Sequence, residues 1–196
     1  MTKLLIATNN QGKVRELKEL LQGINFEVVT PAELNIRLEV DETGTTYEEN
    51  ALLKAVAFCK VSGLLTLADD SGIEVDALNG EPGIRSSRYA GENAKDSDRV
   101  NFLLNKLKDV PEEKRTAHFR CVITIASPDG RVEYCQGRCD GAIITAIRGN
   151  EGFGYDPIFY FPELGKTMAE LPMNIKNSIS HRALAAKEAV KVINRM

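Results

Sequence analysis

The segment KLLIATNNQGKVRELKELL, residues 3–21, decides the fold class. It begins with the short apolar run Lys3–Ala7, which predicts a buried strand. The polar residues 8–13 then form a turn, and apolar side chains from Val14 to Leu21 recur at helical spacing. A strand that leads through a polar loop into a helix is a building unit of α/β proteins.

The same alternation continues along the chain. Strands are predicted over residues 26–30, 64–68, 117–125 and 158–161, and helices after a capping box at Thr46, before Pro111 and from about Ser180 onward. Gly63 is expected to end the first of these helices. Asp69–Gly72 is expected to be an acidic turn at a strand end, and Ser127–Gly130 the turn of an antiparallel hairpin. This order favours an α/β fold with a mixed central sheet and flanking helices, in one domain over residues 1–196.

The composition excludes several classes of protein. With 43% hydrophobic and 27% charged residues, the chain has the proportions of a globular protein rather than a disordered, fibrous or membrane one. Its net charge of -3 provides no basic field for nucleic acid or for an anionic membrane. The apolar run Leu4–Ala7 is too short for a signal segment, so a cytoplasmic protein is expected.

The sequence contains four cysteines and two histidines. A chain of this length forms a core without disulfides, so the cysteines are expected to be buried free thiols. Cys135 and Cys139 have the spacing of half a zinc site. Structural zinc is not expected, because no second half of such a site is present.

The polar loop Thr8–Lys13 is a candidate anion site. Free N–H groups at a helix start and the positive end of the helix dipole attract phosphate, and Lys13 would add a cation. The loop is not a P-loop, because Ala7 replaces the first glycine and Val14 the hydroxyl residue. A polar connection with only a capping role is the alternative.

Two adjacent acids, Asp69 and Asp70, follow an apolar strand. Ionised carboxylates at the edge of a core are costly unless they are paired with a cation. Mg²⁺ is typically held by one or two carboxylates together with substrate phosphates, and Glu42 and Glu48 are further acids that could reach it. For the aspartate pair taken alone, a solvated or capping turn is the alternative.

Residues 152–157 place two aromatic side chains among glycines, which suits the stacking of a nucleobase. A tight turn whose aromatics cover the core is the alternative. Lys176 and Arg182 put hydrogen-bond donors near the start of the last helix, where Ser180 is an ordinary N-cap. A phosphate loop, a carboxylate pair, an aromatic platform and a cationic helix start together predict a nucleoside triphosphate site.

Six ordered motifs carry a family resemblance. They are Thr8–Lys13, Glu42–Gly44, Glu49–Ala51, Ala68–Gly72, Phe153–Pro157 and Ser180–Arg182. In their order and spacing they resemble the inosine triphosphate pyrophosphatases. The resemblance covers essentially the whole chain and implies hydrolysis of the noncanonical purine nucleotides ITP, dITP and XTP to the monophosphate and pyrophosphate. It also implies a Mg²⁺-dependent homodimer with two lobes around a long active-site cleft.

The resemblance further assigns roles to single residues. Asp70, Lys13 and Lys54 would be catalytic, Asp70 as the proton acceptor for the attacking water, and Glu42 and Asp70 would hold the metal. The substrate-binding residues would be Thr8, Asn9, Asn10, Gln11, Gly12, Lys13, Ser71, Phe153, Gly154, Tyr155, Asp156, Lys176, His181 and Arg182. Among them, Phe153 would stack on the base. Arg182 would donate to the oxygen at position 6 of the purine.

Two other functions fit the same residues. A Maf-like pyrophosphatase with another base preference shares the metal chemistry, although the motifs at Phe153 and at Ser180–Arg182 argue against it. A nucleotide-binding sensor without hydrolysis is the second alternative, and the intact Asp70 and Lys13 argue against it.

Overall fold

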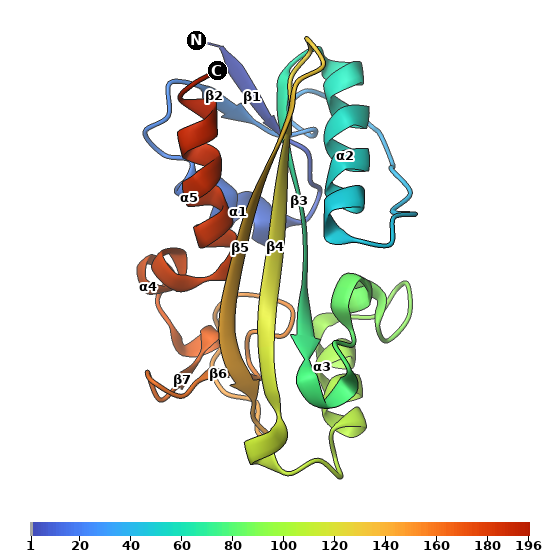
Figure 1. Ribbon diagram of the computed structural model, residues 1–196, viewed down its shortest axis with the longest axis vertical. Coiled ribbons are helices and arrows are strands. Elements are labelled where there is room, and N and C mark those ends of the chain that lie inside the picture. Colours follow the sequence, from blue (N-terminus) through green and yellow to red (C-terminus); the bar gives the residue numbers. More distant parts are fainter. Residues whose placement is uncertain (1) are drawn as a thin grey trace. The chain divides into compact units, whose positions relative to one another are not determined.

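The computed structural model describes residues 2–196, in which strands and helices alternate around a mixed sheet (Figure 1). The strands are β1 (Lys3–Ile6), β2 (Glu27–Val29), β3 (Leu65–Val75), β4 (Thr116–Ala126), β5 (Val132–Ile143), β6 (Phe159–Phe161) and β7 (Lys166–Thr167). The α-helices are α1 (Gln11–Leu20), α2 (Tyr47–Ser62), α3 (Asp96–Lys106), α4 (Met173–Ile179) and α5 (His181–Ile193).

The strands of the described residues form one seven-stranded sheet in the order β2-β1-β3-β4-β5-β6-β7. β1 runs parallel to both β2 and β3, whereas β6 is antiparallel to β5 and to β7. The predicted α/β class with a mixed sheet and flanking helices is therefore confirmed.

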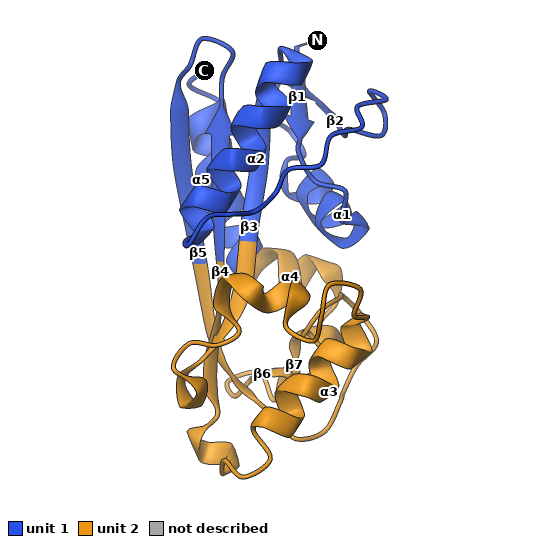
Figure 2. Cartoon of the chain, turned by 90° about the vertical axis from the view of Figure 1, so that its right-hand side faces the viewer, with its two compact units in different colours: residues 1–70, 121–137, 181–196 blue, residues 71–120, 138–180 orange. Residues whose placement is uncertain are grey.

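The described chain divides into two compact units (Figure 2). Unit 1 contains the residues up to Asp70 together with 121–137 and 181–196, and unit 2 contains 71–120 and 138–180. Three of the four boundaries fall inside β3, β4 and β5, and the fourth lies between α4 and α5. The organisation of residues 1–196 as a single domain stays a prediction.

The core of unit 1 follows from the alternation of side chains along β1. Leu4 and Ile6 are fully buried in a cluster with residues of α1 and α5, such as Leu17 and Ala185. Leu5 points the other way, into a cluster with residues of α2. Successive side chains of a strand face opposite sides of the sheet. Helices therefore cover both faces of this unit (Figure 1).

Unit 2 has its own apolar cluster, which joins its parts of β3 and β4 to α3 and β6. Phe119 of β4 lies against Phe159 of β6, with 4.6 Å between the ring centroids. Leu103 of α3 is fully buried in the same cluster. The short helix α4 in this unit was not among the predicted elements.

Several local predictions are confirmed. The side chain of Thr46 accepts a hydrogen bond from the Glu49 N–H at 3.1 Å, and Gly63 ends α2 in the left-handed conformation, with φ of 66°. The turn between β4 and β5 is closed by the Ser127 N–H, which donates to the Arg131 carbonyl at 2.9 Å. All four cysteines are buried thiols outside any disulfide. These signals depend on neighbouring residues, so the sequence reveals them directly.

The prediction of an acidic turn at Asp69–Gly72 is wrong. These residues lie inside β3, which is continuous from Leu65 to Val75. Acidic residues are disfavoured in strands, but here Asp69 and Asp70 have cationic partners in the folded chain. The local signal for a turn is overridden by these contacts.

Among residues 2–196, no helix has both the length and the apolar character needed to span a bilayer.

Gly137 of β5 allows the close approach of α5. A Cβ at this position would lie 2.1 Å from the His181 carbonyl oxygen and 2.5 Å from the Ala185 nitrogen. We expect Gly137→Ala to lower the free energy of unfolding by about 1–3 kcal/mol, the usual cost of overpacking. Urea denaturation measures the loss. Gln136→Ala, at the adjacent exposed position, serves as the control and should change stability by less than about 0.5 kcal/mol.

Candidate functional site

The loop between β1 and α1 is held by its own polar side chains. Asn10 is the N-cap of α1, and its Oδ1 accepts a hydrogen bond from the Lys13 N–H at 3.1 Å. The Asn10 N–H donates to Thr8 Oγ1 at 3.2 Å. The predicted strand, loop and helix are therefore confirmed. The cap also holds the backbone of Lys13 in place.

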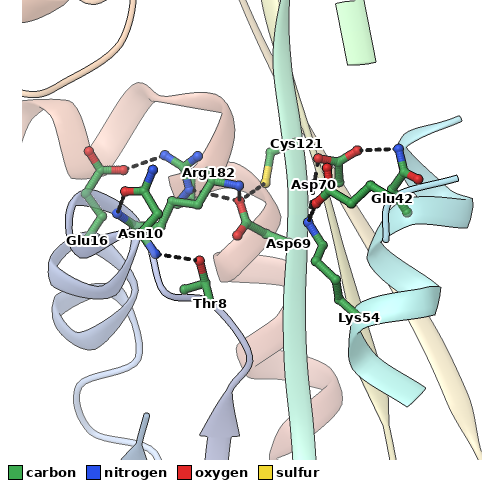
Figure 3. Close-up of polar contacts among 11 residues, drawn as sticks. Thr8, Asn10, Glu16, Glu42, Lys54, Asp69, Asp70, Cys121 and Arg182 are labelled. Carbon is green, nitrogen blue, oxygen red and sulfur yellow. Dashed lines mark hydrogen bonds and ion pairs between the residues drawn. The ribbon is translucent and has the colours of Figure 1, made fainter. Parts of the chain in front are cut away.

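The two aspartates of β3 point to opposite sides of the strand (Figure 3). Asp69 faces Arg182 and Asp70 faces Lys54. This arrangement follows from the continuity of β3, because successive side chains alternate across a strand. A turn at this position would not have separated the two carboxylates in this way.

Asp69 is a buried anion with two cationic partners. Its Oδ2 lies 2.9 Å from Lys13 Nζ and 3.3 Å from Arg182 Nε. Burial alone would raise the pKa of the Asp69 carboxyl, but the charges of Lys13 and Arg182 outweigh burial and hold that pKa well below its ordinary value. Asp69 therefore remains ionised and connects the first turn of α1 to the start of α5.

Asp70 lies beside a second ion pair. Lys54 Nζ is 3.7 Å from Asp70 Oδ1 and 2.5 Å from Glu42 Oε1. Burial raises the pKa of the Asp70 carboxyl, although the nearby Lys54 charge opposes the shift. Burial lowers the pKa of Lys54, but the charges of Asp70, Asp69 and Glu42 outweigh burial and raise it. Asp70 is consequently a stronger proton acceptor than an ordinary carboxylate.

The carboxylates of Glu42 and Asp70 fit a hard divalent cation. Both contact the same ammonium group, that of Lys54, so the two negative charges converge on one cationic position. Their donor atoms are oxygens, which Mg²⁺ prefers, and Mg²⁺ needs only one or two carboxylates when phosphates complete its shell. No group of three or more potential metal-ligating side chains occurs within residues 2–196. Glu48, the other acid considered, instead accepts a hydrogen bond from Gln136 at 3.0 Å.

Arg182 is almost completely buried, with 2% of its side chain exposed. Its Nη1 lies 2.6 Å from Glu16 Oε2, and its Nε contacts Asp69. Burial lowers the pKa of an arginine, but the charges of Asp69 and Glu16 outweigh burial and raise the pKa of Arg182 further above its ordinary value. The guanidinium therefore neutralises two buried carboxylates from two other elements.

A second cluster belongs to unit 2. Lys176 of α4 lies 2.5 Å from Asp156 Oδ2, and its Nζ stands 5.1 Å from the centroid of the Phe153 ring. The Phe153 N–H donates to the same Asp156 oxygen at 2.9 Å. Gly152 has a φ of 77°, and a Cβ there would lie 2.0 Å from Asp156 Oδ2. Only glycine accommodates this turn.

The structure groups the predicted residues as follows. Within unit 1, Lys13 and Arg182 both pair with Asp69. On the other side of β3, Lys54 pairs with Glu42 and Asp70. Within unit 2 the structure joins Phe153, Asp156 and Lys176. Ser71 opens unit 2, Tyr155 donates to the Ser86 carbonyl at 2.9 Å, and His181 is buried at the start of α5.

Sequence reasoning assigned no role to two residues of this network. Asp69 was recognised as an acid, but its contacts became definable only once β3 proved continuous. Glu16 lies among the polar residues of α1, and it meets Arg182 at a separation of 166 residues. For Asp69, the apolar strand before it was the available signal, because a buried acid requires a partner. For Glu16 the sequence contains no such signal.

The chain is similar to known proteins over nearly its whole length. The model of the Ham1 family matches residues 4–192. A dITP/XTP pyrophosphatase from Desulforamulus reducens is 51% identical over 99% of this chain and 96% of the relative, and one from Bacillus subtilis is 44% identical over 98% of each. A solved HAM1 protein from Coxiella burnetii is 39% identical and superposes with a TM-score of 0.90 over 100% of both chains.

Proposed function

The chain belongs to the Ham1 family, and we propose that it hydrolyses noncanonical purine nucleoside triphosphates, namely ITP, dITP and XTP, to the monophosphate and pyrophosphate. It is a nucleoside triphosphate pyrophosphatase, in agreement with relatives that carry the name dITP/XTP pyrophosphatase. The observation that supports the chemistry is the ion-pair group of Asp70, Lys54 and Glu42, with Lys13 on the neighbouring Asp69.

Each residue of this group has a part in the reaction. Water attacks the α-phosphorus, the bond to the bridging oxygen breaks, and pyrophosphate leaves. Asp70 accepts the proton of the attacking water, which its burial favours. Lys13 and Lys54 stabilise the negative charge that develops on the phosphate oxygens. Mg²⁺, when bound by Glu42 and Asp70, supplies further charge neutralisation.

The phosphates bind at the β1–α1 loop. Residues 8–13 lie at the start of α1, and the capped geometry of Asn10 holds that start in place. Anions are stabilised at such a position by the helix dipole and by direct hydrogen bonds. Lys13, which pairs with Asp69, adds a positive charge there.

Recognition of the base rests on the residues that the family resemblance assigns to it. Phe153 offers a ring face for stacking, which tolerates different edge groups on a base. Arg182 and His181 are donors suited to the oxygen at position 6, where adenine carries an amino group instead. Gly154, Tyr155, Asp156 and Lys176 complete the proposed set.

A panel of nucleoside triphosphates tests the proposed function. Pyrophosphate release is measured with Mg²⁺ for ITP, dITP, XTP, ATP, GTP, CTP and UTP. We expect ITP, dITP and XTP to have the highest kcat/KM values of this panel. A preference for UTP would indicate the Maf-like activity, and binding of ITP without release of pyrophosphate would indicate a sensor.

The same proposal includes assembly and location. A homodimer in the cytoplasm is proposed from the family resemblance. Light scattering on the purified chain measures the mass of the assembly.

Lys13 is expected to act in the transition state as well as in binding. Lys13→Ala should lower kcat for ITP by about 10-fold or more and also raise KM, because charge on the phosphates increases during the reaction. Steady-state kinetics separates the two effects. Lys18→Ala is the control, because Lys18 lies on the same helix in an exposed ion pair with Glu33. A rise in KM with unchanged kcat would mean that Lys13 only binds the substrate.

A further inference from the structure

Asn50 is a fully buried polar residue of α2, with no exposed surface. Its side chain makes two hydrogen bonds to parts of the chain outside its own helix. Oδ1 accepts from the Gly44 N–H at 2.9 Å, and Nδ2 donates to Asp70 Oδ2 at 3.2 Å. A backbone N–H can only donate and an ionised carboxylate can only accept, so these two partners fix the orientation of the amide.

Asn50 and Lys54 lie one helical turn apart, so they share a face of α2. Lys54 contacts Asp70 and Glu42, while Asn50 contacts Asp70 and Gly44. Glu42 and Gly44 lie two residues apart in the loop before α2. Lys54 and Asn50 of α2 therefore each connect Asp70 to the loop before the helix. Lys54 does so through Glu42, and Asn50 does so through Gly44.

Gly44 fits this contact closely. A Cβ on Gly44 would lie 2.7 Å from Asn50 Oδ1 and 2.6 Å from Glu49 Cβ. The loop can therefore reach the Asn50 amide only if residue 44 has no side chain. The requirement is steric, and it ties the position of the loop that carries Glu42 to the Asn50 side chain.

We propose that Asn50 is a positioning residue for the divalent cation, because its amide holds the Asp70 carboxylate and the Glu42 loop at a fixed separation. This inference rests on the proposed function for the identity of the metal-binding residues. Asn50 touches neither nucleotide nor metal in this role. Residues that orient metal ligands typically change metal affinity or activity by 10- to 100-fold when they are replaced.

Two substitutions break the contact from its two sides. Asn50→Leu keeps a similar volume and removes both hydrogen bonds, whereas Gly44→Ala leaves Asn50 in place and pushes the loop away from it. Each is expected to weaken Mn²⁺ binding at least about tenfold, measured by electron paramagnetic resonance with Mn²⁺ alone. The Mg²⁺ concentration for half-maximal ITP hydrolysis should rise by a similar factor. At saturating Mg²⁺, KM for ITP should stay near the wild-type value.

Thr46→Ala is the matched control. It removes the N-cap of the same helix, which lowers stability, without touching Asp70 or Gly44. Mn²⁺ affinity should remain at the wild-type value in this variant. An equal loss in Thr46→Ala would mean that general weakening of α2 explains the result, and would overturn the proposal.

The remaining outcomes are also decisive. Wild-type Mn²⁺ affinity in a folded Asn50→Leu chain would overturn the proposal. If that chain does not fold, wild-type Mn²⁺ affinity in Gly44→Ala would overturn it. Absence of Mn²⁺ binding by the wild-type chain would overturn it as well. Failure of the proposed function looks different. The wild-type chain would then bind Mn²⁺ but release no pyrophosphate from ITP.

Discussion

Asp70→Asn is expected to lower kcat for ITP by at least about 100-fold while the chain stays folded. The substitution preserves the shape of the side chain but removes the charge. The amide can neither accept the proton of the attacking water nor hold a divalent cation as a carboxylate does. The surrounding partners, Lys54 and the Asn50 amide, remain in place to pack around it.

A control variant separates the effect of Asp70→Asn on kcat from the effect of losing any negative charge. Asp41→Asn is the matched control, because Asp41 is an exposed acid in the segment that carries Glu42. It should keep kcat within about twofold of wild type, since surface changes away from the site have small effects. Circular dichroism and urea denaturation establish that both variants are folded. Near-normal turnover in folded Asp70→Asn would remove Asp70 from the mechanism.

The sequence predicted the local features of the fold because their causes are local. The N-cap at Thr46 and the end of α2 at Gly63 depend on residues within one or two helical turns, and both were predicted correctly. Helical spacing is less informative about which face of α2 is buried. Ala55 and Cys59 are buried, but Leu52, three residues before Ala55, is only half buried. The orientation of a helix depends on what it packs against, which periodicity alone does not specify.

Contacts between distant segments were outside the reach of the sequence. The strand through Asp69 and Asp70 looked like a turn, because the cations that stabilise it come from other elements. The pairing of Glu16 with Arg182 and of Asn50 with Asp70 likewise requires the folded chain. Three of the four boundaries between the two units fall inside strands, where neither composition nor a linker marks them.

The buried Arg182 is expected to have the largest effect on stability. Glu16 and Asp69 are at most 2% exposed, and Arg182 contacts both. Arg182→Ala removes a cationic partner from each of two buried carboxylates, and the loss of a partner is strongly unfavourable for a buried charge. The free energy of unfolding should fall by about 3–5 kcal/mol, the usual cost of breaking a buried ion pair from one side. Urea denaturation provides the measurement.

Arg138→Ala tests whether burial is the cause. Arg138 also forms an ion pair, with Asp140 at 2.6 Å, but both side chains are more than half exposed, at 56% and 71%. Its loss should cost less than about 1 kcal/mol. The double variant Glu16→Leu with Arg182→Met should recover part of the stability lost in Arg182→Ala, because it removes the Glu16 charge together with its partner. Equal losses of unfolding free energy in Arg182→Ala and Arg138→Ala would show that burial is not the cause.

The same Arg182 variant separates a role in the core from a role in base recognition. If the guanidinium only neutralises Glu16 and Asp69, its removal should lower kcat/KM for ITP and ATP by the same factor at a temperature where the variant is folded. If it also donates to position 6 of the purine, ITP should lose more than ATP, by roughly 10- to 100-fold, because only ITP offers an acceptor there. We expect the second result. An ITP to ATP ratio of kcat/KM that stays at the wild-type value would assign Arg182 to the core alone.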